Sequence, residues 1–261
     1  MKLAHISFAR TSWFIFAGLT LIVCSLGIAS IIFYFLPISL DTTQNSYFSQ
    51  TRIWAHRGGN TAKYSPNSPE AVADAFAKGF DGVELDIYFD RELDKIIVSH
   101  DRPYVKQDGN LVTLNAMSRP SSGWFWLDLK NLGELTGNDV KRFVKILAEL
   151  GFVDRTLVES TALGKLIYMD IQGIQTIYWM SAGATRTPIY YIAVKTLLWV
   201  FGIDAVSISI PSLRYIQPHF AATSIFSFTE NSAERLCHLT SQHAIAVVLT
   251  DLSKEQLLPQ C

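Results

Sequence analysis

Gly82-Val83-Glu84-Leu85-Asp86 is the stretch of sequence that decides the fold. On a β-strand successive side chains alternate, so Glu84 and Asp86 project from one face and Val83 and Leu85 from the other. In a parallel sheet covered by helices, such a strand buries both carboxylates. Unpaired buried carboxylates are costly, so we expect a metal ion or a cationic partner beside them.

On either side of this strand, short β-rich runs alternate with segments of helical spacing. Nine strands are predicted, at residues 53–56, 82–88, 95–99, 125–130, 156–160, 175–180, 204–209, 224–229 and 246–251. Helices are predicted between most of them, at residues 69–78, 138–150, 188–201 and 232–242. Strands that alternate with helices indicate βα units and a parallel sheet.

Nine strands exceed the number in a (β/α)8 barrel by one, and the connection after residue 88 resolves the count. Only residues 89–94 separate the second run from the third. A parallel crossover needs about a dozen residues or more. Residues 95–99 are therefore predicted to fold back as a β-hairpin arm. The remaining eight strands predict a somewhat abbreviated TIM barrel in residues 52–261.

The start of the chain has a different character. Residues 13–36 contain no charged side chain. At about 1.5 Å per residue they form roughly 36 Å of helix, enough to cross a hydrocarbon core about 30 Å thick. Trp13 and Tyr34 suit the two interfaces. A cleaved signal peptide normally has about 7–15 apolar residues and a small-x-small site. This run is longer and no such site follows it, so we predict a transmembrane anchor.

The cations that flank the apolar run predict its orientation. Lys2 and Arg10 precede it, and the next cation is Arg52. The positive-inside rule then makes residues 1–12 a cytoplasmic N-terminus. Residues 37–51 become a linker, and the protein is expected to be single-pass, with the domain of residues 52–261 periplasmic or extracellular.

Composition excludes several classes of function. The formal net charge is −1, so no basic footprint points to nucleic acid as a partner. The three cysteines include no CxxC pair, which excludes a cysteine zinc site. Cys237 and Cys261 both lie in the exported part and could pair in an oxidising compartment.

Polar side chains gather where four predicted strands end, and active sites of (β/α)8 enzymes are built from such ends. The four clusters are His56 with Arg57, Glu84 with Asp86, His100 with Asp101, and Asp128 with Lys130. Hard oxygen ligands favour Mg²⁺ or Ca²⁺ over zinc. Glu84, Asp86 and Asp128 are therefore the candidate ligands of one divalent cation.

The other members of these clusters point to phosphate chemistry. Arg57 and Lys130 would meet the negative charge of a phosphodiester and its transition state. Imidazole is the side chain suited to gain and lose a proton near neutral pH, so His56 and His100 can supply the base that activates a nucleophile and the acid that protonates the leaving oxygen. The set predicts phosphodiester cleavage. The sequence holds no GxSxG motif for serine catalysis.

With these residues in place, the chain resembles the glycerophosphodiester phosphodiesterase family, within the superfamily of phospholipase C-like barrels. The strongest matches are residues 56–58, 67–68, 79–86 and 100–101, and weaker ones follow at 126–130, 228–231 and 249–251. The resemblance implies a TIM barrel that hydrolyses a glycerophosphodiester or related phospholipid headgroup ester with a divalent metal. It makes His56 and His100 the acid–base pair, Arg57 a phosphate ligand, and Glu84 and Asp86 metal ligands.

The resemblance also shows departures. Asp128 occupies the position where the family usually has glutamate, and Lys130 the position of its phosphate-facing lysine. Phe228 stands where the family has tryptophan, and residues 65–67 lack the family's glutamate. These departures indicate a divergent member. Two alternatives stay open: cleavage through a cyclic phosphate, as in phospholipase-type relatives, and a catalytically silent membrane-anchored binding barrel.

Two further features allow more than one interpretation. Residues 188–201 are strongly apolar but too short for a span and are interrupted by Lys195, so an outer barrel helix is predicted. The alternative is that their aromatic residues rest on the bilayer. Near the C-terminus, Thr250 and Asp251 are interpreted as a cap of the following helix.

Overall fold

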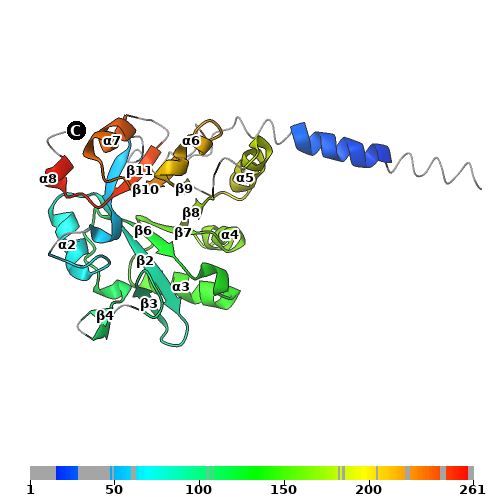
Figure 1. The fold of residues 1–261 in the computed structure, drawn as a ribbon. Coiled ribbons are helices and arrows are strands. Elements are labelled where there is room, and N and C mark those ends of the chain that lie inside the picture. Colours follow the sequence, from blue (N-terminus) through cyan, green and yellow to red (C-terminus); the bar gives the residue numbers. More distant parts are fainter. Residues whose placement is uncertain are drawn as a thin grey trace, which may run out of the picture.

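A closed barrel of eight parallel strands forms the body of the protein (Figure 1). The computed structural model describes residues 16–28, 48, 50–59, 63–104, 106–107, 109–181, 183, 186–203, 205–220, 224–241 and 245–257. The barrel strands are β1 (Arg52–Ala55), β2 (Gly82–Asp90), β6 (Trp124–Leu129), β7 (Thr156–Ser160), β8 (Gln175–Trp179), β9 (Ala205–Ser209), β10 (Ser224–Phe228) and β11 (Ile245–Thr250). Pairing of Ala55 with Val83 closes the ring between β1 and β2. The predicted (β/α)8 class is confirmed.

The predicted hairpin arm is also confirmed. Strand β3 (Lys95–Val98) runs antiparallel to β2, with Val98 opposite Ile87. The connection to β6 continues through β4 (Lys106–Gln107), β5 (Asn110–Leu111) and the 3-10 turn η3 (Leu114–Ala116). Because β3 runs back along β2, the residues that follow it return to the carboxyl end of the barrel.

Helices surround the barrel on the outside. They are α2 (Pro69–Ala77), α3 (Gly137–Glu149), α4 (Leu163–Ile171), α5 (Pro188–Val200), α6 (Leu213–Ile216), α7 (Ala233–Thr240) and α8 (Lys254–Leu257). The four predicted helices correspond to α2, α3, α5 and α7. Ser68 caps α2 and a Thr136–Asp139 capping box begins α3. Helix α4, which Ala162 precedes without a side-chain cap, was not predicted. Helices α6 and α8 have only four residues each, in line with the expected abbreviation.

The barrel interior is filled with aromatic side chains at its N-terminal end. Trp54, Trp124 and Phe226 pack there together, and Phe48 closes the end against them, with its ring centroid 5.0 Å from that of Trp124. Gly82 begins β2 beside this cluster, where a Cβ would lie 2.4 Å from Cδ2 of Trp54. The filled end leaves the carboxyl ends of the strands as the open side.

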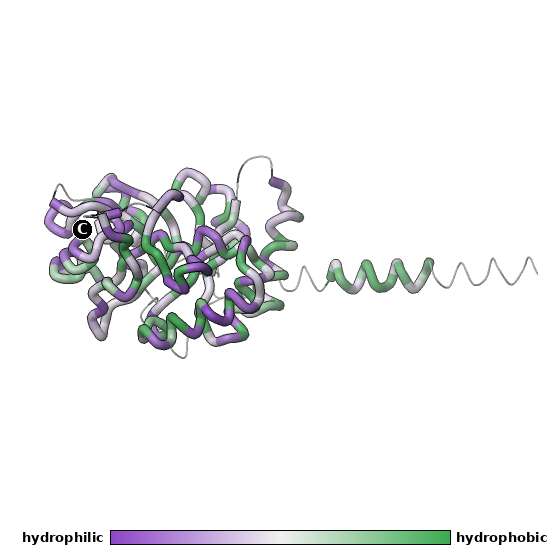
Figure 2. The backbone as a smooth tube through the Cα atoms, turned by 90° about the horizontal axis from the view of Figure 1, so that it is seen from below, coloured by the Kyte–Doolittle hydropathy of each residue, from purple (hydrophilic) through white to green (hydrophobic). Residues whose placement is uncertain are grey.

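The predicted anchor is only partly within the described residues. Residues 16–28 form a helix that stands apart from the barrel in Figure 1 and is predominantly hydrophobic in Figure 2. Among the helices of the described ranges, none is both long and apolar enough to span a bilayer. The rest of the predicted span lies outside the described residues, and so do residues 1–12 and 37–47. The anchor therefore stays a prediction.

Three smaller expectations also reach residues that are not described. The predicted strand start at Asp204 and the predicted helix end at Gln242 lie outside the described ranges. Cys237 takes part in a disulfide, whereas Cys24 is free. The expected partner of Cys237 is Cys261, which also lies outside the described ranges, so the pairing of these two cysteines stays a prediction.

Candidate active site

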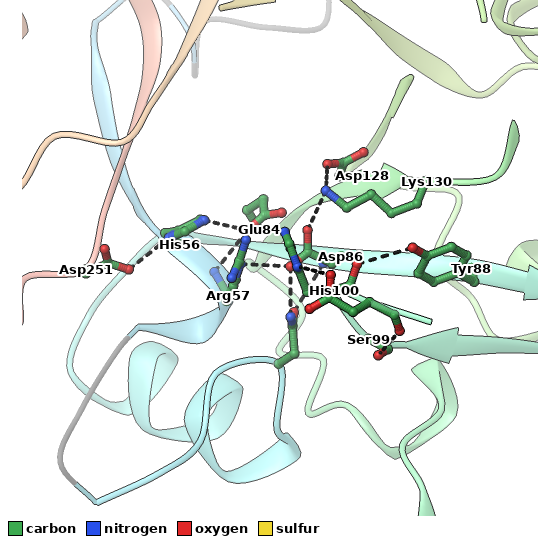
Figure 3. Close-up of polar contacts among 12 residues, drawn as sticks. His56, Arg57, Glu84, Asp86, Tyr88, Ser99, His100, Asp128, Lys130 and Asp251 are labelled. Atoms are coloured by element: carbon green, nitrogen blue, oxygen red, sulfur yellow. Dashed lines mark hydrogen bonds and ion pairs between the residues drawn. The ribbon is translucent and has the colours of Figure 1, made fainter. Parts of the chain in front are cut away.

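All seven predicted site residues line one pocket of about 290 Å³ at the carboxyl end of the barrel. They are His56, Arg57, Glu84, Asp86, His100, Asp128 and Lys130. Figure 3 shows these side chains converging from β2, β6, the turn after β1 and the hairpin arm. Their convergence is what the sequence predicted, and their chemical roles remain predictions.

His56 is held by an acid from the other end of the chain. It begins the 3-10 turn η2 (His56–Gly58) directly after β1, and its Nδ1 lies 2.8 Å from Oδ1 of Asp251. Asn231 donates to the other oxygen of Asp251 at 2.8 Å. Burial acts to raise the pKa of Asp251, but the hydrogen bonds from His56 and Asn231 lower it overall. An ionised Asp251 keeps Nδ1 of His56 engaged, and the other ring nitrogen, Nε2, faces Oε2 of Glu84 at 3.9 Å.

This arrangement corrects the interpretation of Asp251 as a helix cap. The hydroxyl of Thr250 does accept the N–H of Leu252 at 3.1 Å, as in a cap. The carboxylate of Asp251 is instead engaged with His56. The parallel register of β1 and β11 places Ala55 opposite Thr250, so the residues that follow the two strands meet.

Arg57 lies in a turn whose backbone is in the left-handed region. Its φ is 54°, and the following Gly58 has a φ of 77°. A Cβ on Gly58 would come within 2.9 Å of the backbone N of Val72, so glycine is required there. The turn directs the N–H of Arg57 at Oε2 of Glu84, 3.0 Å away. It also brings Nε of Arg57 to 2.8 Å from Oδ2 of Asp86, an ion pair.

Asp86 is the most heavily supported acid of the site. The side-chain amide of Asn67 donates to Oδ2 of Asp86 at 2.9 Å, and the amide oxygen accepts the N–H of Asp86 at 3.2 Å. Nζ of Lys130 lies 2.7 Å from Oδ1. Burial acts to raise the pKa of Asp86, but Lys130, Asn67 and Arg57 together lower it. Asp86 is therefore a stable carboxylate.

The pKa values of Glu84 and Asp128 are raised, in contrast to that of Asp86. Burial, followed by repulsion from Asp86 and Asp128, raises the pKa of Glu84 well above its usual value. Burial also raises the pKa of Asp128 despite the charge of Lys130. One ligand oxygen from each of Glu84, Asp86 and Asp128 lies within 4.8 Å of the others. Ligand oxygens on one Ca²⁺ can be up to about 4.6–5.2 Å apart. The donor chemistry and the spacing thus fit a hard divalent cation.

Lys130 lies between two of these acids. Its ammonium contacts Asp128 as well as Asp86, as Figure 3 shows. Burial acts to lower the pKa of Lys130, but the two carboxylates raise it overall, so the side chain stays charged. Asp128 and Lys130 therefore form an ion pair inside the pocket.

His100 reaches the site from the hairpin arm rather than from a barrel strand. The N–H of Ser99 donates to the carbonyl of Asp86 at 3.0 Å, which holds the end of β3 beside the acids. Nδ1 of His100 lies 2.9 Å from Oδ1 of Asp101. The side chain of His100 is 43% exposed, against 20% for His56. The second imidazole is therefore the more accessible of the two.

Glu159 is a buried acid of the pocket that the sequence analysis did not single out. It follows Asp128 in the next strand of the sheet, in direct register. Glu159 accepts hydrogen bonds from Nε1 of Trp126 and from Oγ of Ser207, the latter at 2.7 Å. Burial raises the pKa of Glu159 well above its usual value. Its position within an apolar strand is the same signal that identified Glu84.

Apolar residues complete the lining of the pocket, and we name them the apolar wall. It is formed by Trp126, Leu129, Trp179, Phe228 and Leu249. Phe228, which departs from the family pattern, packs edge-on to Trp126 at a centroid distance of 6.3 Å. Trp126 therefore supplies an indole next to the position where the family has one.

Fold and site together define a (β/α)8 barrel with paired imidazoles, a carboxylate cluster and two cations at its mouth. Solved structures with this fold include a glycerophosphodiester phosphodiesterase from Parabacteroides distasonis, with a TM-score of 0.62 and 15% identity over 81% of this chain and 97% of that one. Another, from Agrobacterium tumefaciens, has a TM-score of 0.55 and 16% identity, covering 77% and 96% of the two chains.

A third similar structure carries a ligand. It is a phosphodiesterase from Oleispira antarctica in complex with the product sn-glycerol-3-phosphate, with a TM-score of 0.61 and 17% identity over 82% of this chain and 98% of that one. No protein-family model and no curated protein matches the sequence. The resemblance to glycerophosphodiester phosphodiesterases is thus confirmed in the fold, which this chain shares over nearly the whole length of those structures.

Proposed function

We propose that this protein is a metal-dependent phosphodiester hydrolase that acts on glycerophosphodiesters or related phospholipid headgroup esters. The observation that carries the proposal is the convergence of two imidazoles, three carboxylates and two cations in one pocket. The fold of the similar phosphodiesterases and the sn-glycerol-3-phosphate bound to one of them support the substrate class.

One divalent cation, Mg²⁺ or Ca²⁺, is part of the proposal. Glu84, Asp86 and Asp128 would hold it. When bound, such an ion neutralises charge on a phosphoryl group and polarises its oxygen. The raised pKa values of Glu84 and Asp128 reflect mutual repulsion and burial that a divalent cation would offset.

The chain's own residues account for the remaining steps. Arg57 and Lys130 line the pocket as cations and bind the substrate phosphate. His56, with Nδ1 held by Asp251, presents Nε2 for proton transfer. His100 supplies the second transfer, so one imidazole takes the proton of the attacking group and the other protonates the leaving oxygen. The apolar wall covers the uncharged side of the bound ester.

A substrate screen tests this function. The purified full-length protein is incubated with glycerophosphocholine and glycerophosphoethanolamine, with and without a chelator. We expect glycerol 3-phosphate and the free alcohol, and loss of turnover with the chelator. A cyclic phosphate product would instead establish internal attack by a neighbouring hydroxyl. Tight binding of Mg²⁺, Ca²⁺ and Mn²⁺ without cleavage of any diester would establish a silent binding barrel.

The membrane anchor belongs to the same proposal. Residues 13–36 would span the bilayer, with residues 1–12 in the cytoplasm and the barrel in the periplasm or outside the cell. The uncharged sequence and the exposed, hydrophobic helix of residues 16–28 support it. Protease added to the outer side of sealed vesicles or spheroplasts should digest the barrel. Protection of the barrel until lysis would contradict this orientation.

A further inference from the structure

Helix α5 has no charged residue on its outward side. A helix on the surface of a globular protein normally turns its charged residues outward and its apolar residues inward. In α5 the only charged residue, Lys195, is 3% exposed, and its Nζ donates to the carbonyl of His219 at 3.3 Å. Ile189 is 72% exposed and Val200 53% exposed. The outward side of α5 is thus uncharged.

Exposed apolar residues continue along α5 and beyond its end. We name them the α5 apolar face, made of Ile189, Leu197, Trp199, Val200 and Phe201. Helix α5 begins at the carboxyl end of the barrel, where the hydroxyl of Tyr190 donates to the carbonyl of Ser181 at 3.4 Å. Ser181 follows closely on Trp179, which lines the pocket and is itself exposed. The face therefore extends from the rim of the pocket along the side of the barrel.

We propose that the α5 apolar face rests on a lipid bilayer. The proposal rests on the predicted anchor and does not depend on catalysis. Because Phe48 packs on the barrel, residues 37–47 are the part of the linker that can extend, to about 36 Å at most at roughly 3.3 Å per residue, which keeps the barrel near the bilayer that holds residues 13–36.

The residue types of the α5 apolar face suit contact with a lipid bilayer. An apolar helix side with Trp199 and neighbouring aromatic residues is typical of segments that lie in the membrane interface. Arg186, just before α5, stacks over the ring of Tyr190 at 4.8 Å and suits the level of phospholipid headgroups. In this orientation Trp179 and the pocket mouth lie at the bilayer surface, so esters carried by a lipid can reach the site.

Spin labelling of the full-length protein tests this contact. Leu197→Cys is introduced in a Cys24→Ser background, labelled with a nitroxide and reconstituted into vesicles of phosphatidylcholine and phosphatidylglycerol. The matched control is Ala73→Cys on α2, which lies on the opposite side of the barrel (Figure 1). We expect collisions with oxygen to dominate at position 197 and collisions with a water-soluble nickel complex to dominate at position 73.

Two results would overturn the proposal. The first is a label at position 197 that meets the nickel complex as freely as the label at position 73. The second is dipolar broadening between labels at position 197, which would assign the face to a second copy of the chain.

A charge-insertion variant gives an independent readout. Leu197→Glu combined with Val200→Glu should reduce hydrolysis of a vesicle-borne diester several-fold and leave hydrolysis of glycerophosphocholine unchanged. A variant that hydrolyses both substrates at the rates of the parent protein would contradict the proposal. If the parent protein cleaves neither substrate, the proposed function fails, while the spin-label result still decides the contact.

Discussion

His56 and Asp251 are separated by 195 positions in the sequence, yet Nδ1 of His56 lies 2.8 Å from Oδ1 of Asp251. Closure of the barrel produces this contact, because β1 and β11 are neighbours and run in parallel. The acid holds the ring in one orientation, with Nε2 directed at Glu84 and available for the proposed proton transfer. The pair is thus the most specific positioning device of the site.

Substitution of the orienting acid should slow the reaction without abolishing it. Asp251→Asn keeps the shape but removes the charge that favours one orientation of the ring. We expect a fall in kcat smaller than the roughly 10²–10⁴-fold attributed to a positioned acid or base. Steady-state kinetics measure it, with the exposed Asp154→Asn as the control. Unchanged kcat would show that the contact is not used.

Removal of either imidazole should have a larger effect. His56→Ala and His100→Ala are each expected to lower kcat by about 10²–10⁴-fold, since each removes one proton-transfer group. Circular dichroism should stay that of the parent. His238→Ala, on the exposed side of α7, is the matched control and should retain full activity. A double histidine variant with full activity would contradict the mechanism.

Loss of a metal ligand should weaken cation binding. Glu84→Gln is expected to lower the affinity for Mg²⁺ or Ca²⁺ by more than the roughly 10–100-fold typical of outer-shell partners. Titration calorimetry on chelator-treated protein measures the affinity. Asp81→Asn, just before β2, alters an acid at the opposite end of the barrel and should bind as the parent does. Equal affinities for the two variants would exclude Glu84 as a ligand.

Glu159 predicts a dependence of stability on pH. Burial raises the pKa of Glu159 in the folded state above its unfolded value of about 4.3. Such a carboxyl contributes its stability fully below the unfolded pKa and loses it as pH rises through the folded pKa. Glu159→Gln removes the charge, and the Ser207 hydroxyl can accept from the new amide. We therefore expect Tm to fall less with rising pH in the variant.

Thermal unfolding between about pH 4 and pH 8, in the presence of chelator, measures this difference. The exposed Glu92→Gln is the control and should follow the parent at every pH. Parallel Tm profiles for Glu159→Gln and the parent would show that Glu159 titrates normally.

Gly82 tests the packing of the closed end of the barrel. In Gly82→Ala the new Cβ would lie 2.4 Å from Cδ2 of Trp54, a buried ring that has no room to move. Overpacking of this kind costs about 1–3 kcal/mol in the free energy of unfolding. Urea denaturation measures the change. Gly133→Ala, where no atom lies within 4 Å of the added Cβ, should unfold as the parent does.

Local patterns made most of the fold predictable. Alternation around Glu84 and Asp86 identified β2 and both of its faces, and the short connection after it identified the antiparallel arm. Helical spacing identified α2, α3, α5 and α7. Helix α4 and the β4–β5 hairpin were not predicted: no side chain caps the start of α4, and strands of two residues show no periodicity.

The sequence predicted seven residues of the candidate site, but not the roles of Asp251 and Glu159. Its seven residues belong to local motifs, so they were found without knowledge of the barrel's closure. Asp251 was misinterpreted because its partner lies at the other end of the chain, and only the register of β1 and β11 brings them together. Glu159 carried a usable signal, an acid beside the buried Leu157 and Val158 of its strand, but no charged residue two positions away drew attention to it.

The hairpin arm has a consequence for how the chemistry is divided. One imidazole is fixed to the wall of the barrel, while the other is carried by a strand that only flanks it. The spacing between the two imidazoles, which we propose as the proton carriers, is therefore set by the ladder between β2 and β3 and not by the ring of eight strands. Substitutions in the hairpin arm can therefore alter the distance between the two imidazoles, and with it the size of the ester that fits, while the eight-stranded barrel remains intact.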